Sequence, residues 1–497
     1  MGNARYHLMK FRQIRDGLKQ ELYMSSIATI ILAAGKGTRM KSERAKVLHE
    51  VCGLPLVSYP LALASELGSE VTAVVVGHQR EEVEAAVDKT ADRQTVVFAH
   101  QTEQRGTGHA VMTGMDALRD FHGQVYILSG DVPLLKKQTL LQLEQAYRDA
   151  GGPMAFVTFC PQDAGSYGRV IRDDRQRPVA IREFRDCTDA QKRITEVNAG
   201  IYLVDADFLR TSVSGLKADN AQGELYLTDL VEMASASALV ATVETAPQEV
   251  AGVNDRFDLL AIEQTLQKEI NDRWMAAGVT IQSPDTVHID MHCEIGADTR
   301  ISAGVHLQGT TRIGPGCIIE PGAVIRDSVI AADVVIKAYS VVENAIVDRY
   351  ATVGPMARLR PGAHLHENAH VGNWVELKNT VLGEGSKANH LAYLGDGVIG
   401  RNVNIGAGCI FCNYDGFLKH RTTIEDNVFV GSDSQMVAPV MIREGAYIAT
   451  GTTVTHEVPA NGLAISRGRQ INKPGLGEQL RERLRKARDK FKKETRI

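Results

Sequence analysis

Aromatic side chains are scarce in this chain, while glycine and aliphatic residues are abundant. Aromatics make up 5% of the 497 residues and only two are tryptophan, whereas hydrophobic residues reach 44% and glycine numbers 45. Part of the chain must therefore pack aliphatic side chains and turn on small residues. At roughly 100 to 200 residues per domain, the length predicts two to four domains and excludes a single small module.

Neither an excess of one charge nor a long hydrophobic run is present. The 56 Lys and Arg residues balance 60 Asp and Glu residues, so the chain has no general attraction to a polyanion. The longest apolar runs, such as residues 27–34, fall short of the roughly 18 residues of a membrane span. We therefore expect neither a nucleic-acid partner nor a membrane span.

Cysteines are too few and too scattered for a disulfide framework. There are seven, and only Cys409 and Cys412 lie close together. This usage indicates reduced thiols and a cytoplasmic protein. The N-terminus lacks the apolar core and cleavage site of a secretory signal, and Tyr6 replaces the Ser or Thr of a myristoylation motif. We interpret residues 1–25 as an N-terminal extension, with Met24 as an alternative start.

Residues 26–254 alternate β-branched runs with helical stretches. This alternation predicts a mostly parallel, Rossmann-like α/β sheet with functional loops at the carboxyl ends of its strands. Apolar side chains then recur at helical spacing, which predicts a linker helix at 255–277. The expected strands are 28–32, 71–76, 95–98, 125–128 and 155–159, and the expected helices are 56–67, 80–87, 108–118 and 140–150.

Beyond the linker helix, the hydrophobic period becomes six. Neither a helix period of 3.6 nor a strand period of 2 produces such a pattern. It predicts a solenoid of hexapeptide units, each with one short parallel strand and one tight turn. The aliphatic positions begin at Ile295, Ile301, Leu307, Ile313 and Ile319, shift by one at Ile330 and Val347, continue from Val353 to Leu377, and resume from Ile399 to Ile448.

The segment 471–497 is a basic tail with helical spacing of its apolar residues. Leu480, Leu484, Ala487 and Phe491 share one face, and Lys and Arg cover the other. Two interpretations remain open here. The tail is either a solvated helix docked on the end of the solenoid or a basic segment that contacts an anionic partner.

A glycine-rich segment follows the first expected strand directly. It reads Leu32-Ala-Ala-Gly-Lys-Gly-Thr-Arg-Met40 and is followed by Lys46. Glycines let backbone N–H groups approach phosphates, while Lys and Arg supply positive charge. The Walker spacing is missing, and Met40 occupies the third glycine position of a dinucleotide fingerprint.

The longer string resembles the signature of sugar-1-phosphate nucleotidyltransferases. Ala45 stands where that family usually has proline, and we expect this change to loosen the backbone before Lys46. The resemblance implies that Arg39 and Lys46 stabilise phosphate charge. It also implies nucleotide contacts from Leu32, Ala33, Ala34 and Gly35; the matching positions are Leu32, Gly35, Gly37, Thr38, Met40 and Lys46.

Polar residues follow two further strands. Gln101 and the pair Gly106-Thr107 come after the third expected strand, where we expect them to read a base. Ser129, Gly130 and Asp131 end the next strand, where Mg²⁺ commonly bridges a carboxylate to phosphates. A lone Asp after a strand also forms turns or caps, but the nearby phosphate loop favours the metal interpretation.

Four more strings resemble the uridylyltransferase subgroup, and they contain Gly168, Glu183, Asn198 and Asn254. The resemblance implies that these residues bind the nucleotide sugar and that Asn254 joins Asp131 in holding Mg²⁺. The implied chemistry is attack of a sugar phosphate oxygen on the α-phosphate of UTP, with pyrophosphate leaving. Charge neutralisation should dominate, and no protein nucleophile is required.

Dense polar strings interrupt the hexapeptide period around 382–399 and again at 412–416. Loops that interrupt a regular scaffold usually carry function. His390 alone would be an ordinary loop histidine, but His is the usual general base near neutral pH. Arg358, Lys378 and Tyr393 would form a phosphate-and-sugar pocket beside it. We disfavour a zinc or redox site at Cys409-Ile-Phe-Cys412, because no second cysteine pair is present.

These solenoid strings closely resemble those of the bacterial bifunctional N-acetylglucosamine-1-phosphate uridylyltransferase/glucosamine-1-phosphate N-acetyltransferases. The resemblance runs from about residue 27 to residue 467 and implies that His390 deprotonates the amine of glucosamine 1-phosphate. It assigns that substrate to Arg358, Lys378, Tyr393 and Asn404, and acetyl-CoA to Ala407, Asn413, Tyr414, Ser432, Thr450 and Arg467. Thr450 replaces an alanine of better-known relatives, and we expect that contact to involve the backbone.

The resemblance also implies a complete architecture and a reaction sequence. The expected fold is α/β, with a Rossmann-like uridylyltransferase domain at 26–254, a long linker helix, a left-handed parallel β-helix acetyltransferase domain at 278–470 and a basic tail. The implied enzyme acetylates glucosamine 1-phosphate with acetyl-CoA. It then transfers UMP from UTP to N-acetylglucosamine 1-phosphate, giving UDP-N-acetylglucosamine for cell-envelope polymers. Adjacent subunits of a homotrimer would complete each acetyl-transfer site.

An alternative keeps the nucleotidyltransferase but makes the solenoid an oligomerisation and regulatory scaffold. ADP-glucose pyrophosphorylase-like proteins have such an arrangement. His390, Asn413, Tyr414 and Arg467 argue against it, because a scaffold needs neither a base nor an acetyl-CoA cleft.

Overall fold

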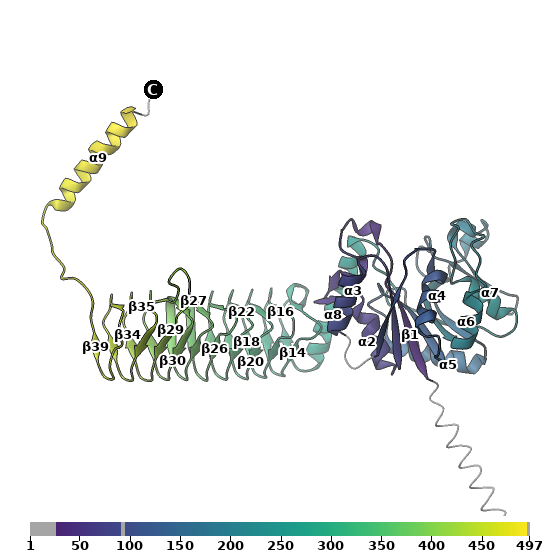
Figure 1. Cartoon of the computed structure of the whole chain (residues 1–497), viewed down its shortest axis with the longest axis horizontal. Helices are drawn as coiled ribbons and strands as arrows, with labels where there is room; N and C mark the ends of the chain where they lie inside the picture. The colour runs from purple at the N-terminus through teal and green to yellow at the C-terminus, as the bar shows by residue number, and fades with distance from the viewer. Residues whose placement is uncertain (1–25, 91–94, 495–497) are drawn as a thin grey trace, which may run out of the picture. The chain divides into compact units, whose positions relative to one another are not determined.

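The computed structural model describes residues 26–90 and 95–494, so the predicted extension at 1–25 lies outside the described residues. The chain divides into two compact units (Figure 1). Of the described residues, the first unit contains those up to Arg273 and Ile289–Met291, and the second contains Trp274–His288 and those from His292 onward. The five-part division predicted from sequence remains a prediction.

The first unit is built on a nine-stranded, mostly parallel sheet whose main path runs β11-β7-β10-β6-β1-β4-β5. Helices α4, α6 and α7 pack on one face and α2, α3 and α5 on the other, which is why strands such as β1 are buried along nearly their whole length. The nine strands of this sheet are β1 (Ile27–Leu32), β4 (Val71–Val76), β5 (Val96–His100), β6 (Gln124–Ser129), β7 (Met154–Phe159), β8 (Arg169–Arg172), β9 (Pro178–Arg182), β10 (Val197–Asp205) and β11 (Ala241–Thr245), while β2 (Glu50–Val51) and β3 (Leu54–Pro55) form a separate two-stranded sheet. The helices are α2 (Ser58–Glu66), α3 (Arg80–Thr90), α4 (Thr107–Ala117), α5 (Lys137–Ala150), α6 (Ala206–Val213) and α7 (Asp229–Ser235).

All five strands and four helices predicted for this unit are confirmed, with ends that differ by a few residues. The antiparallel strand β10 was not expected. It lies between β6 and β7, and its register with β7 is irregular between Asn198 and Tyr202. The predicted linker helix is present as α8 (Arg256–Ala276), and Ile262, Leu266 and Ile270 are its buried face.

The second unit is a parallel β-helix in which each short strand pairs with the equivalent strand of the next coil. The predicted inward positions are buried, and the predicted phase shifts appear as 17-residue steps from Ile313 to Ile330 and on to Val347. One row of strands forms a nine-stranded sheet: β14 (Glu294–Ile295), β17 (Arg312–Ile313), β20 (Val329–Ile330), β23 (Ile346–Val347), β26 (His364–Leu365), β28 (Val381–Leu382), β30 (Gly397–Ile399), β33 (Thr422–Ile424) and β36 (Val440–Ile442).

Two further rows join into a nineteen-stranded sheet. Its strands are β12 (Thr280–Ile281), β13 (His288–Ile289), β15 (Arg300–Ile301), β16 (His306–Gln308), β18 (Ile318–Ile319), β19 (Val324–Arg326), β21 (Val335–Ile336), β22 (Val341–Glu343), β24 (Thr352–Val353), β25 (Arg358–Leu359), β27 (His370–Lys378), β29 (Lys387–Gly395), β31 (Asn404–Ile405), β32 (Ile410–Cys412), β34 (Phe429–Val430), β35 (Gln435–Val437), β37 (Tyr447–Ile448), β38 (Thr453–Val454) and β39 (Leu463–Ala464).

The predicted interruption of the solenoid at 382–399 is wrong. Ala388 and Leu394 are fully buried and continue the period of six from Leu382. Their strand, β29, pairs with β27 along most of its length. Both strands turn a corner at a residue with positive φ, Trp374 and Leu391 respectively. The polar string is therefore part of the regular coils of the solenoid and does not form a separate loop.

The second predicted interruption is confirmed. Leu382 pairs with Ile399, 17 residues on, but Ile399 pairs with Ile424, 25 residues on. The extra residues form a loop after β32, which is closed by a bridge between Tyr414 and Lys419 and protrudes from the solenoid near β29 (Figure 1).

The basic tail forms helix α9 (Leu476–Glu494). Its apolar side chains are exposed, with Leu480 at 53% and Leu484 at 60%, and both interpretations of the tail stay predictions. Within the described part of the chain, none of the helices combines the length and the hydrophobicity that crossing a membrane requires.

Candidate active sites

The glycine-rich segment after β1 packs directly against Lys46. The segment continues into the short 3-10 helix η1 (Thr38–Met40), and Lys46 begins a second one, η2 (Lys46–Leu48). Gly37 precedes η1 with φ +59°, and a Cβ at this position would lie 2.5 Å from the Cβ of Lys46. Glycine is therefore required here both for its conformation and for the close approach.

Lys46 forms an ion pair with Asp131, and both side chains are less than one fifth exposed. The two residues meet because Leu32, at the end of β1, pairs with Ser129 at the end of β6. Parallel strands thus bring the two sequence motifs to one edge of the sheet, as expected.

Arg39 and Asn254 complete this charged cluster. The Val253 N–H donates to the Asp131 carbonyl at 3.0 Å, which places the GVND string beside Asp131. Arg39 Nη2 donates to Asn254 Oδ1 at 2.8 Å. The predicted metal ligands, Asp131 and Asn254, thus lie in neighbouring segments and offer a carboxylate and an amide oxygen. Such hard oxygen donors fit a divalent cation of the magnesium type. In this structure each oxygen is held by a cationic side chain.

The expectation that Ala45 loosens the backbone is wrong. Ala45 is 1% exposed and adopts φ −53° and ψ 139°, a conformation that proline would also favour. Its N–H, which proline would lack, donates to Gln79 Oε1 at 2.5 Å. A side chain that the sequence did not single out thus fixes the approach to Lys46.

A cavity of about 370 Å³ opens beside the charged cluster. Gln104, which was not predicted, lines it and donates to the Ala34 carbonyl at 2.7 Å, while Thr107 Oγ1 accepts from the Leu227 N–H at 3.2 Å. Ala33 and Gly130 do not line it, since both are held close to neighbouring strands. The predicted residues along its wall are Leu32, Ala34, Gly35, Lys46, Gln101, Gly106, Thr107, Ser129 and Asp131, and Glu224 also lines it.

Gly168, Glu183 and Asn198 form a second group in this unit. The Asn198 N–H donates to the Gly168 carbonyl at 2.9 Å, and a Cβ on Gly168 would lie 3.4 Å from Glu183 Oε1. Burial raises the pKa of Glu183, and Thr228 Oγ1 donates to its Oε1 at 3.1 Å. Since Leu227 contacts Thr107, the segment 225–228 connects this group with the wall of the cavity.

In the second unit, His390 heads a line of turn positions. His390, Ala407, Ser432 and Thr450 each lie two residues after one of four residues that pair in register from coil to coil: Ala388, Ile405, Val430 and Ile448. We call these four residues the corner column. At about 4.8 Å per coil, the column extends roughly 14 Å from His390 to Thr450.

Arg467 lies at the far end of the corner column. Its Nη1 donates to the Thr450 carbonyl oxygen at 2.6 Å, so this contact depends on the backbone and not on the side chain of Thr450. The exposed Tyr414 hydroxyl donates to the Gly416 carbonyl at 2.6 Å within its own loop. Cys409 is buried, and burial raises the pKa of its thiol, which disfavours a thiolate here.

A second polar group centres on Asp396. Asn413 Nδ2 donates to its Oδ2 at 2.5 Å, Asn379 donates to Oδ1 at 2.8 Å, and Lys378 Nζ lies 3.7 Å from Oδ2. Burial acts to raise the pKa of Asp396, but these hydrogen bonds and the Lys378 charge hold it below its usual value. Lys419 reaches Lys378 from the protruding loop, and this hydrogen bond together with the Lys378 charge lowers the Lys419 pKa. Two lysines side by side favour an anionic ligand.

The four residues predicted to bind glucosamine 1-phosphate lie on two faces of the solenoid. Arg358 and Tyr393 both pair with Glu376 in register, on the face that continues into β32. Lys378, the last residue of β27, pairs with Gly395 of the same segment. Asn404 begins β31, on the face before the corner, where it pairs with Lys387. His390 also lies before this corner, which Leu391 turns.

Three family models match parts of the chain. Residues 29–189 match a MobA-like NTP transferase domain. Residues 283–363 match a GMPPB C-terminal domain, and residues 421–456 match a hexapeptide repeat of succinyl-transferase. These matches agree with a nucleotidyltransferase unit followed by a hexapeptide solenoid.

Curated proteins named "Bifunctional protein GlmU" match nearly the whole chain. The protein from Geotalea uraniireducens (strain Rf4) is 48% identical over 454 residues, covering 91% of this chain and 99% of the relative. The protein from Sorangium cellulosum (strain So ce56) is 47% identical over 468 residues, covering 93% and 98%. At this identity and coverage, the chain belongs to the family of GlmU bifunctional proteins.

Proposed function

We propose that this chain catalyses two consecutive transfers: acetylation of glucosamine 1-phosphate by acetyl-CoA, and then uridylyl transfer from UTP to the product. The observation that carries this proposal is that each unit of this GlmU-family chain contains its own group of polar residues. One unit groups Arg39, Lys46, Asp131 and Asn254 beside a cavity. The other aligns His390 with three turn positions of a solenoid.

In the first unit, we assign the cavity to UTP and the adjoining group around Glu183 to the sugar. Arg39 and Lys46 would neutralise the triphosphate while the sugar phosphate oxygen attacks the α-phosphate and pyrophosphate leaves. Asp131 and Asn254 would hold Mg²⁺, which supplies further charge neutralisation of the phosphates when bound. Lys46 and Arg39, which contact these two oxygens in the structure, are placed to turn toward the phosphates instead.

In the second unit, we assign His390 as the general base. It would accept a proton from the glucosamine amine as that nitrogen attacks the thioester carbonyl, and the thiol of coenzyme A would leave. The corner column would form an extended binding surface for acetyl-CoA that ends at Arg467. Lys378 and Lys419 would bind the sugar phosphate, with Arg358, Tyr393 and Asn404 around the sugar and Asn413 and Tyr414 beside the acyl donor.

We propose that the acetyl-transfer site is completed by a second copy of the chain in a homotrimer. Asn404 and His390 lie on one face of the solenoid, while Arg358 and Tyr393 lie past the corner on the next. Side chains on two different outer faces of one solenoid point away from each other, so they cannot contact the same small sugar. A neighbouring solenoid can bring its second face against the first face of this one.

We place both reactions in the cytoplasm, since UTP and acetyl-CoA are cytoplasmic metabolites and the chain has reduced-type cysteine usage. The product, UDP-N-acetylglucosamine, would feed synthesis of peptidoglycan and lipopolysaccharide.

Two single variants of the full chain test the function, because each should lose one of the two activities and keep the other. His390→Ala should lower thiol release from acetyl-CoA with glucosamine 1-phosphate by roughly 10²- to 10⁴-fold and leave UTP-dependent pyrophosphate release unchanged. Asp131→Ala should lower pyrophosphate release by roughly 10²- to 10³-fold and spare acetylation.

Matched controls are His456→Ala, an exposed histidine of the same solenoid, and Asp149→Ala, an exposed carboxylate on α5. Both should leave both activities at the wild-type level. Loss of both activities in either site variant, or of neither, would contradict the two-site assignment. An acetylation activity absent from the wild type would favour a scaffold role for the solenoid.

A further inference from the structure

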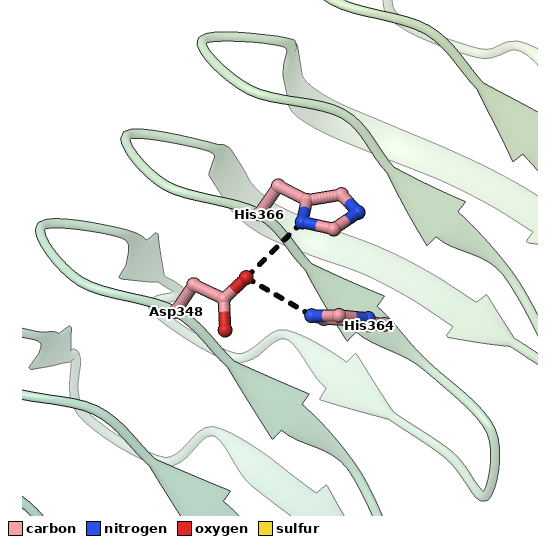
Figure 2. A group of neighbouring side chains, drawn as sticks. All are labelled: Asp348, His364 and His366. Carbon is pink, nitrogen blue, oxygen red and sulfur yellow. Dashed lines mark hydrogen bonds and ion pairs between the residues drawn. The ribbon is translucent and has the colours of Figure 1, made fainter.

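Two histidines and an aspartate gather on the remaining row of the solenoid, away from the residues assigned to acetyl transfer. Asp348 follows β23, and His364 and His366 flank the fully buried Leu365 in β26 (Figure 2). Because side chains alternate along a strand, both histidines point outward when Leu365 points inward. Val347 pairs with Leu365 in register, so Asp348 of one coil lies beside His366 of the next.

One carboxylate oxygen lies close to both imidazoles. Asp348 Oδ2 is 3.0 Å from His364 Nε2 and 3.1 Å from His366 Nδ1, as the dashed lines in Figure 2 show. The ring centroids are 4.2 Å apart, and one ligand atom from each residue falls within a 4.8 Å group. With metal–ligand bonds near 2.0–2.1 Å, the donors of a tetrahedral zinc site lie roughly 3.3 Å apart. The three side chains thus need little movement to surround one metal ion.

The neighbouring charges leave this group available to a cation. Two arginines line the open groove of about 660 Å³ beside it, but each has another carboxylate partner. Arg349 pairs with Asp333 at 3.1 Å and Arg401 pairs with Asp426 at 2.9 Å. Glu367 and Glu384 also line the groove and add negative charge. The ion pairs described for Asp348 are those with the two histidines.

We propose that Asp348, His364 and His366 form a binding site for Zn²⁺ or a similar first-row transition-metal ion. Two imidazole nitrogens and one carboxylate oxygen are a donor set that such ions prefer over Mg²⁺ or Ca²⁺. Water from the open groove completes the coordination. The ion links two successive coils, because Asp348 comes from one and both histidines come from the next.

The site is separate from both catalytic constellations. Its strands, β23 and β26, belong to the nine-stranded row, whereas Arg358, Tyr393 and Asn404 belong to the nineteen-stranded sheet. The ligand side chains are between 30% and 43% exposed, so an ion in solution can reach them. Replacing them leaves the buried Leu365 in place, and the variants should therefore fold.

Zinc binding by the full-length protein tests the proposal. Chelator-stripped protein in excess Mg²⁺ is titrated with Zn²⁺ by calorimetry, and bound zinc is counted by elemental analysis after gel filtration. Wild-type protein should bind one more Zn²⁺ per chain than His364→Ala/His366→Ala, and Asp348→Asn should weaken that site at least tenfold. Four-coordinate Co²⁺ should give visible absorption bands that the double variant lacks.

The matched control is His288→Ala/His306→Ala, which removes another histidine pair that stacks across the solenoid, with ring centroids 4.7 Å apart. No metal-binding group is found around that pair in the described part of the chain. This control should keep the same zinc stoichiometry and cobalt bands as wild type. Equal zinc binding by wild type and by a folded His364→Ala/His366→Ala variant would overturn the proposal, because the trio would then be only a hydrogen-bonded cluster.

Discussion

The two units of this chain place their proposed site residues in opposite ways. In the first unit, residues as far apart as Arg39 and Asn254 are hydrogen-bonded to each other beside one cavity. In the second unit, His390 and Thr450 are neighbours only through the stacking of coils, and Tyr393 lies past a corner from His390. The residues of the proposed site in the first unit lie together within a single chain, whereas those in the second unit are divided between two faces of the solenoid.

Fold geometry accounts for this difference. A parallel sheet directs the loops after all its strands to one edge, so residues from distant segments converge. A solenoid repeats each position at a fixed spacing and displays it on one face, so residues of different faces diverge. A solenoid enzyme therefore needs either a long loop or a second chain to close a pocket. The described solenoid has such a loop at 413–421, and we propose that a second chain supplies the rest.

A large effect is expected at the site in the first unit. Lys46→Ala removes the cation beside Asp131, so uridylyl transfer should fall roughly 10²- to 10³-fold while acetyl transfer is unchanged. Steady-state assays of pyrophosphate and of free thiol check this. Lys137→Ala, which removes an exposed lysine at the start of α5, is the matched control and should change neither. A loss of less than threefold in Lys46→Ala would break the assignment of this cluster to the phosphates.

An intermediate effect is expected at the end of the corner column. Arg467 donates to the Thr450 carbonyl and lies where acetyl-CoA would end. Arg467→Ala should raise the KM for acetyl-CoA roughly tenfold, the equivalent of one charged hydrogen bond.

Two companion variants sharpen that prediction. Thr450→Ala keeps the backbone carbonyl and should leave the KM unchanged. The exposed Arg469 is the control, and Arg469→Ala should also be silent. If Thr450→Ala raised the KM as much as Arg467→Ala, the side chain of Thr450 and not its backbone would hold the contact.

The smallest effect should come from the support of Lys46. Gln79→Ala leaves the buried Ala45 N–H without its acceptor, which should destabilise the chain by about 1 kcal/mol and lower uridylyl transfer a few-fold. Adding Ala45→Pro removes that N–H and restrains φ near its present −53°. Thermal unfolding and kcat/KM should both recover in the double variant. A double variant worse than Gln79→Ala would contradict this account of the backbone.

Much of the fold could be predicted because its periodicities are strong. The six-residue period identified the inward aliphatic positions from Ile295 to Ile448, including both phase shifts. Strands with buried β-branched runs, such as Val71–Val76, were also found at their correct bounds. The antiparallel placement of β10 between β6 and β7 could not be predicted, because a strand carries no local signal for its direction or its neighbours.

The candidate sites were predicted unevenly for a physical reason. Short motifs identified the residues at strand ends, such as Lys46 and Asp131, because strand order brings strand ends together. Gln79, Gln104 and Lys419 were missed, since their contacts depend on long-range packing. The segment around Leu391 gave a wrong prediction of an interruption, because its inward residues Ala388 and Leu394 stand within a dense polar string.

Complementation between two inactive variants tests the central claim most directly. His390→Ala disables the face before the corner, and Lys378→Ala disables the face after it. Each variant alone should show almost no acetyl transfer, and mixed trimers from co-expression should regain about one quarter of the wild-type activity per site, because one site in four then combines two intact faces. No recovery in well-mixed trimers, with uridylyl transfer at the wild-type level, would contradict the claim that the acetyl-transfer site is divided between two chains.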